Sequence, residues 1–326
     1  MTGVQIDPRT RMGAVHYTVR DLERMVDFYC RVLGFQLLRR EGDTVSLGVA
    51  AANDATHGVA HGGTARREGE GHAPPQPEGS SPGTELLRLT RNPAAQRYPR
   101  TAGLYHTAFL VPSRWDLAHL VRQIIETRTP VHGHSNHGTH LAIYLPDPEG
   151  NGIELAWDFP REVWPMENGR VLYDRVPRRG VDMEELLQEL DRNPAPWPGL
   201  PPGTAVGHIH LHVAELSATK HFYHEVLGFD VTMESEEWGA LFLSAGGYHH
   251  HIGSNVWKGV GLPPAPPDAL GLRWFTILLP DEAARQSLLA RAKAAGVPME
   301  AHPEGTLLRD PSGINVLLAV DPAPAS

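Results

Sequence analysis

An internal duplication constrains the fold of this chain more than any other feature. Residues 28–35 read FYCRVLGF and residues 222–229 read FYHEVLGF. Each copy ends a segment in which apolar residues first alternate and then recur at a spacing of three and four. Alternation predicts a strand, and the wider spacing predicts an amphipathic helix. The chain therefore contains at least two copies of one strand-helix unit.

Two further segments have the same order of elements. Residues 104–157 and 271–320 each start with a strand pattern, continue with a helix pattern and end with strand patterns. In both, a turn precedes the last strand, DPEG at 147–150 and DPSG at 310–313. We therefore predict an α+β fold of four modules, each with the order β-α-β-β-β, in two tandem pairs.

The length of 326 residues predicts two domains, because it exceeds the size of one ordinary hydrophobic core. We place the N-terminal domain at 11–157 and the C-terminal domain at 206–322. Residues 52–84, rich in Gly, Pro, His and Ser, form an irregular insertion. Residues 158–205 form a linker that contains a short helix, Met183–Leu190, and ends in a stiff Pro-rich run.

Charge and composition exclude several classes of partner. The net charge is −9, so the chain offers no basic face to nucleic acid, and an anionic membrane would repel it. No apolar run approaches the roughly 20 residues that span a bilayer, and the N-terminus lacks an apolar signal core. The single cysteine, Cys30, cannot form an intrachain disulfide. We expect a cytoplasmic protein that binds small molecules, and the sequence is compatible with a homo-oligomer.

The stretch from His137 to Glu154 is the most informative part of the chain. A histidine and Tyr144 precede the DPEG turn, and Glu154 then opens an apolar strand. We place His137 and Tyr144 on the strand before the turn, so that the hairpin forms one wall of a site. Taken singly, a strand His or Glu is more often a surface or satisfied core group.

The four modules, with VLGF after the first helix and DPEGNGIEL before the last strand of module two, resemble the vicinal oxygen chelate superfamily. That superfamily includes glyoxalase I, bleomycin-resistance proteins and the type I extradiol dioxygenases. The hairpin is similar to the extradiol signature of His, an apolar residue with Tyr, Asp-Pro-x-Gly and Glu, although Ser135 departs from it. The whole chain looks most like the two-domain bacterial catechol 2,3-dioxygenases.

The resemblance implies a set of metal ligands. In this superfamily they lie early in the first strand of a module and at the start of its last strand. Those places hold His106 and Glu154 in module two and His208 in module three, but Ala14 in module one and Leu317 in module four. Two His and one carboxylate usually hold non-haem Fe(II), and Mn(II) could replace it. This order departs from most extradiol enzymes, in which all ligands come from the last two modules. From the places of the ligands we infer that modules two and three pair around the metal and that modules one and four pair as a scaffold without metal.

The run His249-His250-His251 supplies candidates for acid/base chemistry. On a strand, His250 would point to one side and His249 and His251 to the other. The resemblance selects His250 as the acid/base group, with His249 as the alternative, and gives Tyr144 and His137 the role of hydrogen-bond donors to the substrate. We also name four aromatic candidates for the walls of the substrate site: Trp257, Tyr248, Phe242 and Phe109.

The resemblance implies a dioxygenase that opens a catechol-type ring beside its two hydroxyls with O₂ and yields a muconic semialdehyde. A glyoxalase I-like isomerase is one alternative, but such enzymes usually add a fourth protein ligand, often a second carboxylate. A metal-free binding protein of the bleomycin-resistance kind is another, although such proteins need no set of two His and one Glu.

Overall fold

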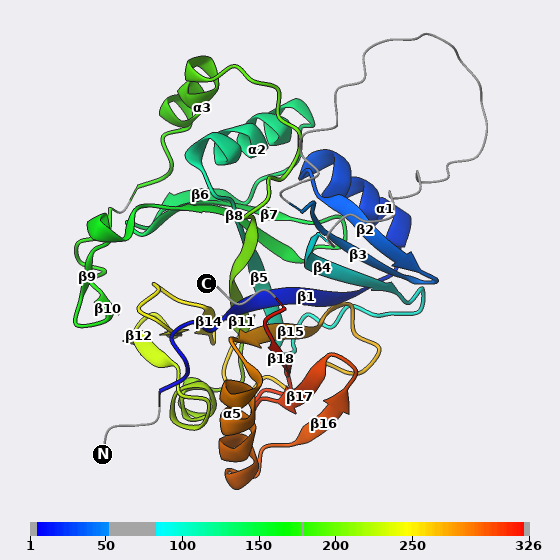
Figure 1. Cartoon of the computed structure of the whole chain (residues 1–326), viewed down its shortest axis with the longest axis vertical. Helices are drawn as coiled ribbons and strands as arrows, with labels where there is room; N and C mark the ends of the chain where they lie inside the picture. Colours follow the sequence, from blue (N-terminus) through cyan, green and yellow to red (C-terminus); the bar gives the residue numbers. More distant parts are fainter. Residues whose placement is uncertain (1–4, 52–82, 178, 323–326) are drawn as a thin grey trace.

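The computed structural model describes residues 5–51, 83–177 and 179–322, and its strands gather mainly in two eight-stranded sheets (Figure 1). The predicted α+β fold of four modules with the order β-α-β-β-β is confirmed. Of the predicted insertion 52–84, residues 52–82 lie outside the described residues, and a strand begins at Thr84. Among the described residues, no helix is long and apolar enough to cross a membrane.

The first two modules follow one another along the chain. Module one consists of β1 (Arg11–Val19), α1 (Leu22–Asp27) with a π-helical turn (Phe28–Val32), β2 (Gln36–Glu41), β3 (Thr44–Val49) and β4 (Thr84–Arg91). Module two consists of β5 (Gly103–Leu110), α2 (Arg114–Glu126), β6 (Gly133–Asn136), β7 (His140–Pro146) and β8 (Gly152–Asp158).

The last two modules repeat this order. Module three consists of β11 (Ala205–His212), α4 (Leu216–Lys220) with a π-helical turn (His221–Val226), β12 (Asp230–Ser235), β13 (Ala240–Ser244) and β14 (Ile252–Asn255). Module four consists of β15 (Gly271–Leu279), α5 (Glu282–Ala294), β16 (Met299–His302), β17 (Gly305–Arg309) and β18 (Asn315–Val320).

Each large sheet joins one module from each half of the chain. The first has the order β16-β17-β18-β15-β1-β4-β3-β2, so module four pairs with module one. The second has the order β12-β13-β14-β11-β5-β8-β7-β6, so module three pairs with module two, as predicted. Because both sheets take strands from both halves, the division into domains at 11–157 and 206–322 stays a prediction.

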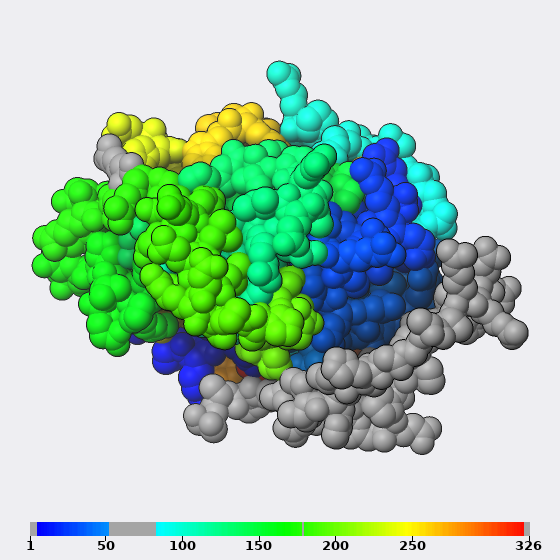
Figure 2. All heavy atoms as spheres, turned by 90° about the horizontal axis from the view of Figure 1, so that it is seen from above, coloured from blue at the N-terminus to red at the C-terminus, as the bar shows by residue number. Residues whose placement is uncertain are grey.

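The segment between the halves contains a 3₁₀ turn (Arg161–Val163), the short strands β9 (Met166–Glu167) and β10 (Arg170–Val171), and helix α3 (Met183–Arg192). The predicted short helix is thus present and extends two residues beyond Leu190. Arg114 at the start of α2 forms an ion pair of 2.9 Å with Glu189 of α3. Figure 2 shows this segment, in green, lying beside α2 on the face seen from above.

The hydrophobic core lies between the sheets and their helices. Val15, Tyr17 and Val19 alternate along β1 and are wholly buried, as period two requires of a strand with one face in the core. The Tyr17 hydroxyl lies 2.7 Å from the Thr107 hydroxyl of β5, so it joins the two sheets. Phe109 of β5 packs edge-on against Phe35, with ring centroids 5.0 Å apart.

Two tyrosine-aspartate hydrogen bonds connect the modules that are consecutive in the chain. The Tyr29 hydroxyl donates to Asp147 of the DPEG turn at 3.1 Å, and the Tyr223 hydroxyl donates to Asp310 of the DPSG turn at 3.0 Å. Burial raises the pKa of both carboxyls to about 6, although the hydrogen bonds they accept work in the opposite direction. The two sheets therefore connect module two with module three and module one with module four. The tyrosine-aspartate hydrogen bonds connect module one with module two and module three with module four.

We expect Tyr29→Phe to destabilise the protein more at pH 8 than at pH 5. A carboxyl whose pKa is raised on folding contributes stability at low pH that is lost as the pH rises through the folded pKa, here about 6. Without the Tyr29 hydrogen bond the pKa of Asp147 in the folded protein rises further, so more stability is lost when Asp147 ionises. The free energy of unfolding should fall by about 1.5–3 kcal/mol at pH 8, the value of a hydrogen bond to a charged group, and by less at pH 5.

Urea denaturation at the two pH values measures this difference. Tyr17→Phe is the matched control, because Tyr17 is equally buried but bonds to an uncharged hydroxyl, and its loss should not depend on pH. Equal losses for Tyr29→Phe at both pH values would contradict the expectation.

Candidate metal centre

Three neighbouring strands of the second sheet bring the predicted ligands together. β5 pairs antiparallel with β11, and Ala108 lies opposite His208. β5 also pairs in parallel with β8, and Ala108 lies opposite Glu154. Because side chains alternate along a strand, His106, Glu154 and His208 all project from the face of the sheet that is turned away from the core.

The ligand atoms of these three residues lie within 4.8 Å of one another. The Oε2 atom of Glu154 is 3.0 Å from Nε2 of His106 and 3.2 Å from Nε2 of His208. All three side chains are buried, and Glu154 has no exposed surface. The structure thus brings together the three residues that the sequence predicted as ligands, two from module two and one from module three.

The donor set fits a divalent metal ion. Nε2 of His106 and Oε1 of Glu154 are buried and make no hydrogen bond, although each has a polar atom 3.0 Å away. Buried polar atoms are nearly always paired, so these two need another partner. Two imidazoles and one carboxylate are a common ligand set of divalent transition metals, and a metal ion between them would satisfy these atoms.

Protonation of the cluster suits the same role. Burial alone would raise the pKa of Glu154, but interaction with His208 and the neighbouring imidazoles lowers it well below its usual value. Burial lowers the pKa of His208 despite the nearby Glu154. The stable state therefore has an ionised carboxylate and a neutral imidazole, which are the forms that bind metals.

His140 contacts the cluster and was missed from the sequence. Its Nε2 atom is 3.0 Å from Oε1 of Glu154, whereas His106 and His208 lie nearest the other oxygen, Oε2. Its Nδ1 atom is 2.9 Å from the Thr139 hydroxyl. Alternation along β7 could have found it, because His140 lies four residues before Tyr144 and thus on the same face of the strand.

His137 and Tyr144 form a pair beside the cluster, with Nε2 of His137 2.7 Å from the Tyr144 hydroxyl. The predicted strand position of His137 is wrong: it lies in the turn between β6 and β7. Gly138 follows it with φ +73, a conformation that breaks the strand and that glycine adopts easily. Burial lowers the pKa of His137 to about 3, and burial together with Glu154 raises the pKa of Tyr144 well above 10.

The prediction that His249, His250 and His251 lie on a strand is also wrong, because β14 begins after them at Ile252. Gly246 and Gly247, with φ +59 and +68, turn the chain after β13, and the three histidines follow in the loop. His250 enters the cavity described below, while His249 lies behind it with its Nδ1 atom 2.9 Å from Nδ1 of His250. His251 points elsewhere and accepts a hydrogen bond from the backbone of Ala245.

A cavity of about 470 Å³ opens over the three predicted ligands. Of the predicted aromatic walls, Phe242 and Trp257 line it. Phe109 does not, because its place in β5 turns it into the core, and Tyr248 packs behind His249 instead. Sequence reasoning missed several other lining residues, which come from four separate parts of the chain: Tyr105, Tyr173, His210, Met233 and Trp238.

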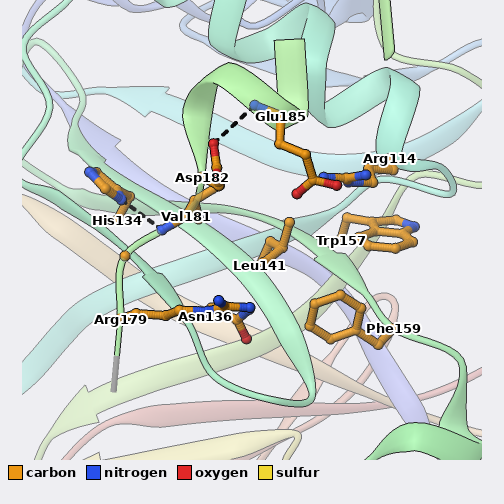
Figure 3. Close-up of a pocket in the computed structure, with 11 residues that line it drawn as sticks. Arg114, His134, Asn136, Leu141, Trp157, Phe159, Arg179, Val181, Asp182 and Glu185 are labelled. Atoms are coloured by element: carbon orange, nitrogen blue, oxygen red, sulfur yellow. Dashed lines mark hydrogen bonds and ion pairs between the residues drawn. The ribbon is translucent and has the colours of Figure 1, made fainter. Parts of the chain in front are cut away.

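Another cavity, of about 570 Å³, lies on the opposite face of β7 and β8 (Figure 3). Leu141, Trp157 and Phe159 line its apolar side, and an ion pair of 2.8 Å between Arg114 and Glu185 lies at its edge. Within the described parts of the chain, the groups of His, Cys, Asp and Glu that could hold a metal all lie on the other face.

Comparison with known proteins identifies the family. Residues 11–155 and 205–318 match the model of the glyoxalase/bleomycin resistance protein/dioxygenase superfamily. The chain belongs to this superfamily. The match covers all four modules, in agreement with the resemblance seen in the sequence.

Two curated relatives are dioxygenases. The chain is 37% identical over 316 residues to the catechol-2,3-dioxygenase of Bacillus subtilis, which covers 95% of this chain and 96% of that protein. It is 42% identical over 67 residues to biphenyl-2,3-diol 1,2-dioxygenase 3 of Rhodococcus globerulus, which covers 19% of this chain and 33% of that one.

Solved structures share the fold. A putative dioxygenase from Bacillus subtilis superposes with a TM-score of 0.58 at 13% identity, covering 98% of this chain and 87% of that one. Glyoxalase I from Zea mays superposes with a TM-score of 0.53 at 15% identity, covering 95% and 92%. At these sequence identities the solved structures support the fold alone. They do not distinguish a dioxygenase from a glyoxalase I.

We expect His106→Gln, Glu154→Gln and His208→Gln each to weaken the binding of Fe(II) or Mn(II) by more than about 100-fold. His140→Gln should weaken it by about 10–100-fold, the usual cost of losing a group that only supports a ligand. Isothermal titration of the metal-free protein under anaerobic conditions measures both. His221→Gln is the control, because that side chain is exposed and pairs with Glu225 far from the cluster. Unchanged affinity in the first three variants would show that the metal binds elsewhere.

Proposed function

We propose that this chain is an extradiol dioxygenase that opens a catechol-type ring with O₂ at a metal centre of His106, Glu154 and His208. One observation carries the proposal: two histidines and one glutamate converge at the floor of a cavity large enough for one aromatic ring. The relative named catechol-2,3-dioxygenase, 37% identical over 95% of the chain, supports the same reaction.

Fe(II) is the proposed metal, and Mn(II) is the alternative, because both suit two imidazoles and one carboxylate. Held by His106, Glu154 and His208, such an ion would supply Lewis acidity toward the substrate oxygens and would support the reaction with O₂. The other steps fall to side chains of the cavity.

His250 is placed to move protons. Its ring stacks on Phe242 with centroids 4.5 Å apart and lies 4.2 Å from the ring of His208, so it lines the cavity next to the proposed metal. Burial lowers its pKa well below the usual value for histidine, which keeps the ring neutral and able to accept a proton from a catechol hydroxyl. The same ring then returns the proton to an oxygen of the opening product.

Tyr144 and His137 are placed to orient the substrate. The raised pKa keeps the Tyr144 phenol protonated, so that its hydroxyl can donate a hydrogen bond to a negatively charged substrate oxygen. His137 contacts that hydroxyl and limits its rotation. Phe242, Trp257 and Tyr105 supply flat apolar surface for the ring.

The ligand set favours this reaction over a glyoxalase I-like isomerase, which usually uses a second carboxylate. In the described part of the chain the group around Glu154 has two histidines and no further carboxylate, and Asp158 belongs to a separate group. A metal-free binding protein is disfavoured because it would have no need of the unpaired buried atoms of His106 and Glu154. We further propose a cytoplasmic location and small-molecule partners alone, and the oligomeric state stays a prediction.

Protein reconstituted anaerobically with Fe(II) should consume O₂ when catechol is added and form a yellow ring-opened product. Oxygen uptake and absorbance measure the two. His250→Gln should lower kcat by about 10²–10⁴-fold, the usual contribution of general acid/base catalysis, and Tyr144→Phe should lower it less.

His221→Gln serves again as the variant that should keep full activity. If the Fe(II) protein neither takes up O₂ nor forms product with any simple catechol, the proposal fails. Isomerisation of a glutathione adduct by the Ni(II) or Zn(II) protein would instead assign the glyoxalase I-like reaction.

A further inference from the structure

Strand β8 carries a second carboxylate on the same face as Glu154. Asp158 lies four residues beyond Glu154, and side chains two and four residues apart along a strand project from one face. The Oδ1 atom of Asp158 is 3.3 Å from Nε2 of His249. Nδ1 of His249 is 2.9 Å from Nδ1 of His250. A continuous line of hydrogen bonds thus runs from Asp158 to the ring that lines the cavity.

Both imidazole rings in this line are held in place. His249 is 1% exposed, and its ring stacks on that of His140 with centroids 4.6 Å apart and planes 17° from parallel. The Thr232 hydroxyl donates to the backbone carbonyl of His249 at 2.7 Å. The stacking of His250 on Phe242 fixes the second ring. The Nδ1–Nδ1 contact is therefore a fixed feature of the loop.

The positions of the protons follow from the chemistry of these atoms. A carboxylate oxygen only accepts hydrogen bonds, so the nitrogen of His249 that faces Asp158 carries the proton. Burial lowers the pKa of His249 well below its usual value, so the ring carries one proton and Nδ1 must accept. His250 must then donate from its own Nδ1. Its Nε2 atom keeps the lone pair and is left for the cavity that the ring lines.

We propose that Asp158 and His249 are positioning residues, which hold His250 in the tautomer whose Nε2 atom faces the cavity as a proton acceptor. The reverse arrangement would turn the lone pair of His249 toward the carboxylate and leave the proton of His250 on Nε2. Without Asp158, both arrangements would be similar in energy. The use of the acceptor in turnover rests on the proposed dioxygenase function, but the tautomer itself does not.

The geometry also separates the two histidines that the sequence left as alternatives. His250 lines the cavity and His249 does not. His249 has both ring nitrogens engaged, one with Asp158 and one with His250. It therefore acts through its neighbour and has no free nitrogen for a substrate.

The first test reads the tautomers directly by two-bond ¹H–¹⁵N correlation on metal-free protein labelled with ¹⁵N-histidine. His249→Phe and His250→Phe assign the two rings. We expect the proton of His249 on Nε2 and that of His250 on Nδ1. In Asp158→Ala the two ¹⁵N shifts of His250 should move toward each other, as in a mixture of tautomers. A proton on Nε2 of His250 in the unaltered protein would overturn the proposal.

The second test uses the Fe(II)-loaded enzyme. Asp158→Ala should lower kcat for catechol about 10–100-fold, as expected for loss of a supporting group, and should change KM less than about twofold. Asp158→Glu should recover part of the loss, because it restores an acceptor. Asp174→Ala, at an exposed linker position, is the matched control. An equal loss in the Ala and Glu variants, or a change in KM alone, would contradict the positioning role.

The two tests fail separately. If the loaded protein shows no dioxygenase activity, the proposed function fails, and the tautomers of His249 and His250 still decide the proposal about Asp158. If the enzyme is active but His250 has the other tautomer, the function stands and the proposal fails.

Discussion

The antiparallel pairing of β5 with β11 is the interaction on which the rest of the structure depends. It is the joint between modules two and three, and its register sets His208 opposite Ala108, two residues along β5 from His106 and therefore on the same face. Glu154 enters from the other side of β5 through the parallel pairing with β8. Because side-chain direction reverses with every residue, a slip of one residue in either pairing would turn a ligand into the core.

The cluster formed by this joint is costly to the fold in the absence of a ligand. An ionised carboxylate is buried without exposure and without a cationic side chain of its own, and two of the buried atoms around it have no hydrogen bond. Burying polar atoms in this way opposes folding by roughly 1–3 kcal/mol for each unpaired group. Ion binding would recover this energy, so affinity for the metal and stability of the loaded protein should rise together.

Sequence patterns predicted those parts of the fold that depend on the periodicity of apolar residues and on the internal repeats. The duplicated FY..VLGF segments and the DPEG and DPSG turns fixed the number and order of the modules, and the superfamily resemblance then picked out His106, Glu154 and His208, which the structure brings together. The predicted strand positions were wrong where a glycine with positive φ ends a strand. Gly138 takes His137 out of the strand, and the Gly246-Gly247 turn does the same for the three histidines after β13. Asp158 escaped notice because its partner His249 is distant in sequence, whereas alternation along β7 would have pointed to His140.

The first sheet repeats the architecture of the second with different side chains. Trp274 pairs with His16 in β15 and β1, as His106 pairs with His210 in β5 and β11, and Leu317 lies opposite Thr276 where Glu154 lies opposite Ala108. Ala14 stands in β1 where His208 stands in β11, so the three equivalent positions of the first sheet hold no metal ligand. The first sheet is thus an internal control: it has the strand pairing of the proposed metal site without the ligands. Placing the three ligand side chains at Ala14, Trp274 and Leu317 would ask whether strand register alone suffices to make a metal centre.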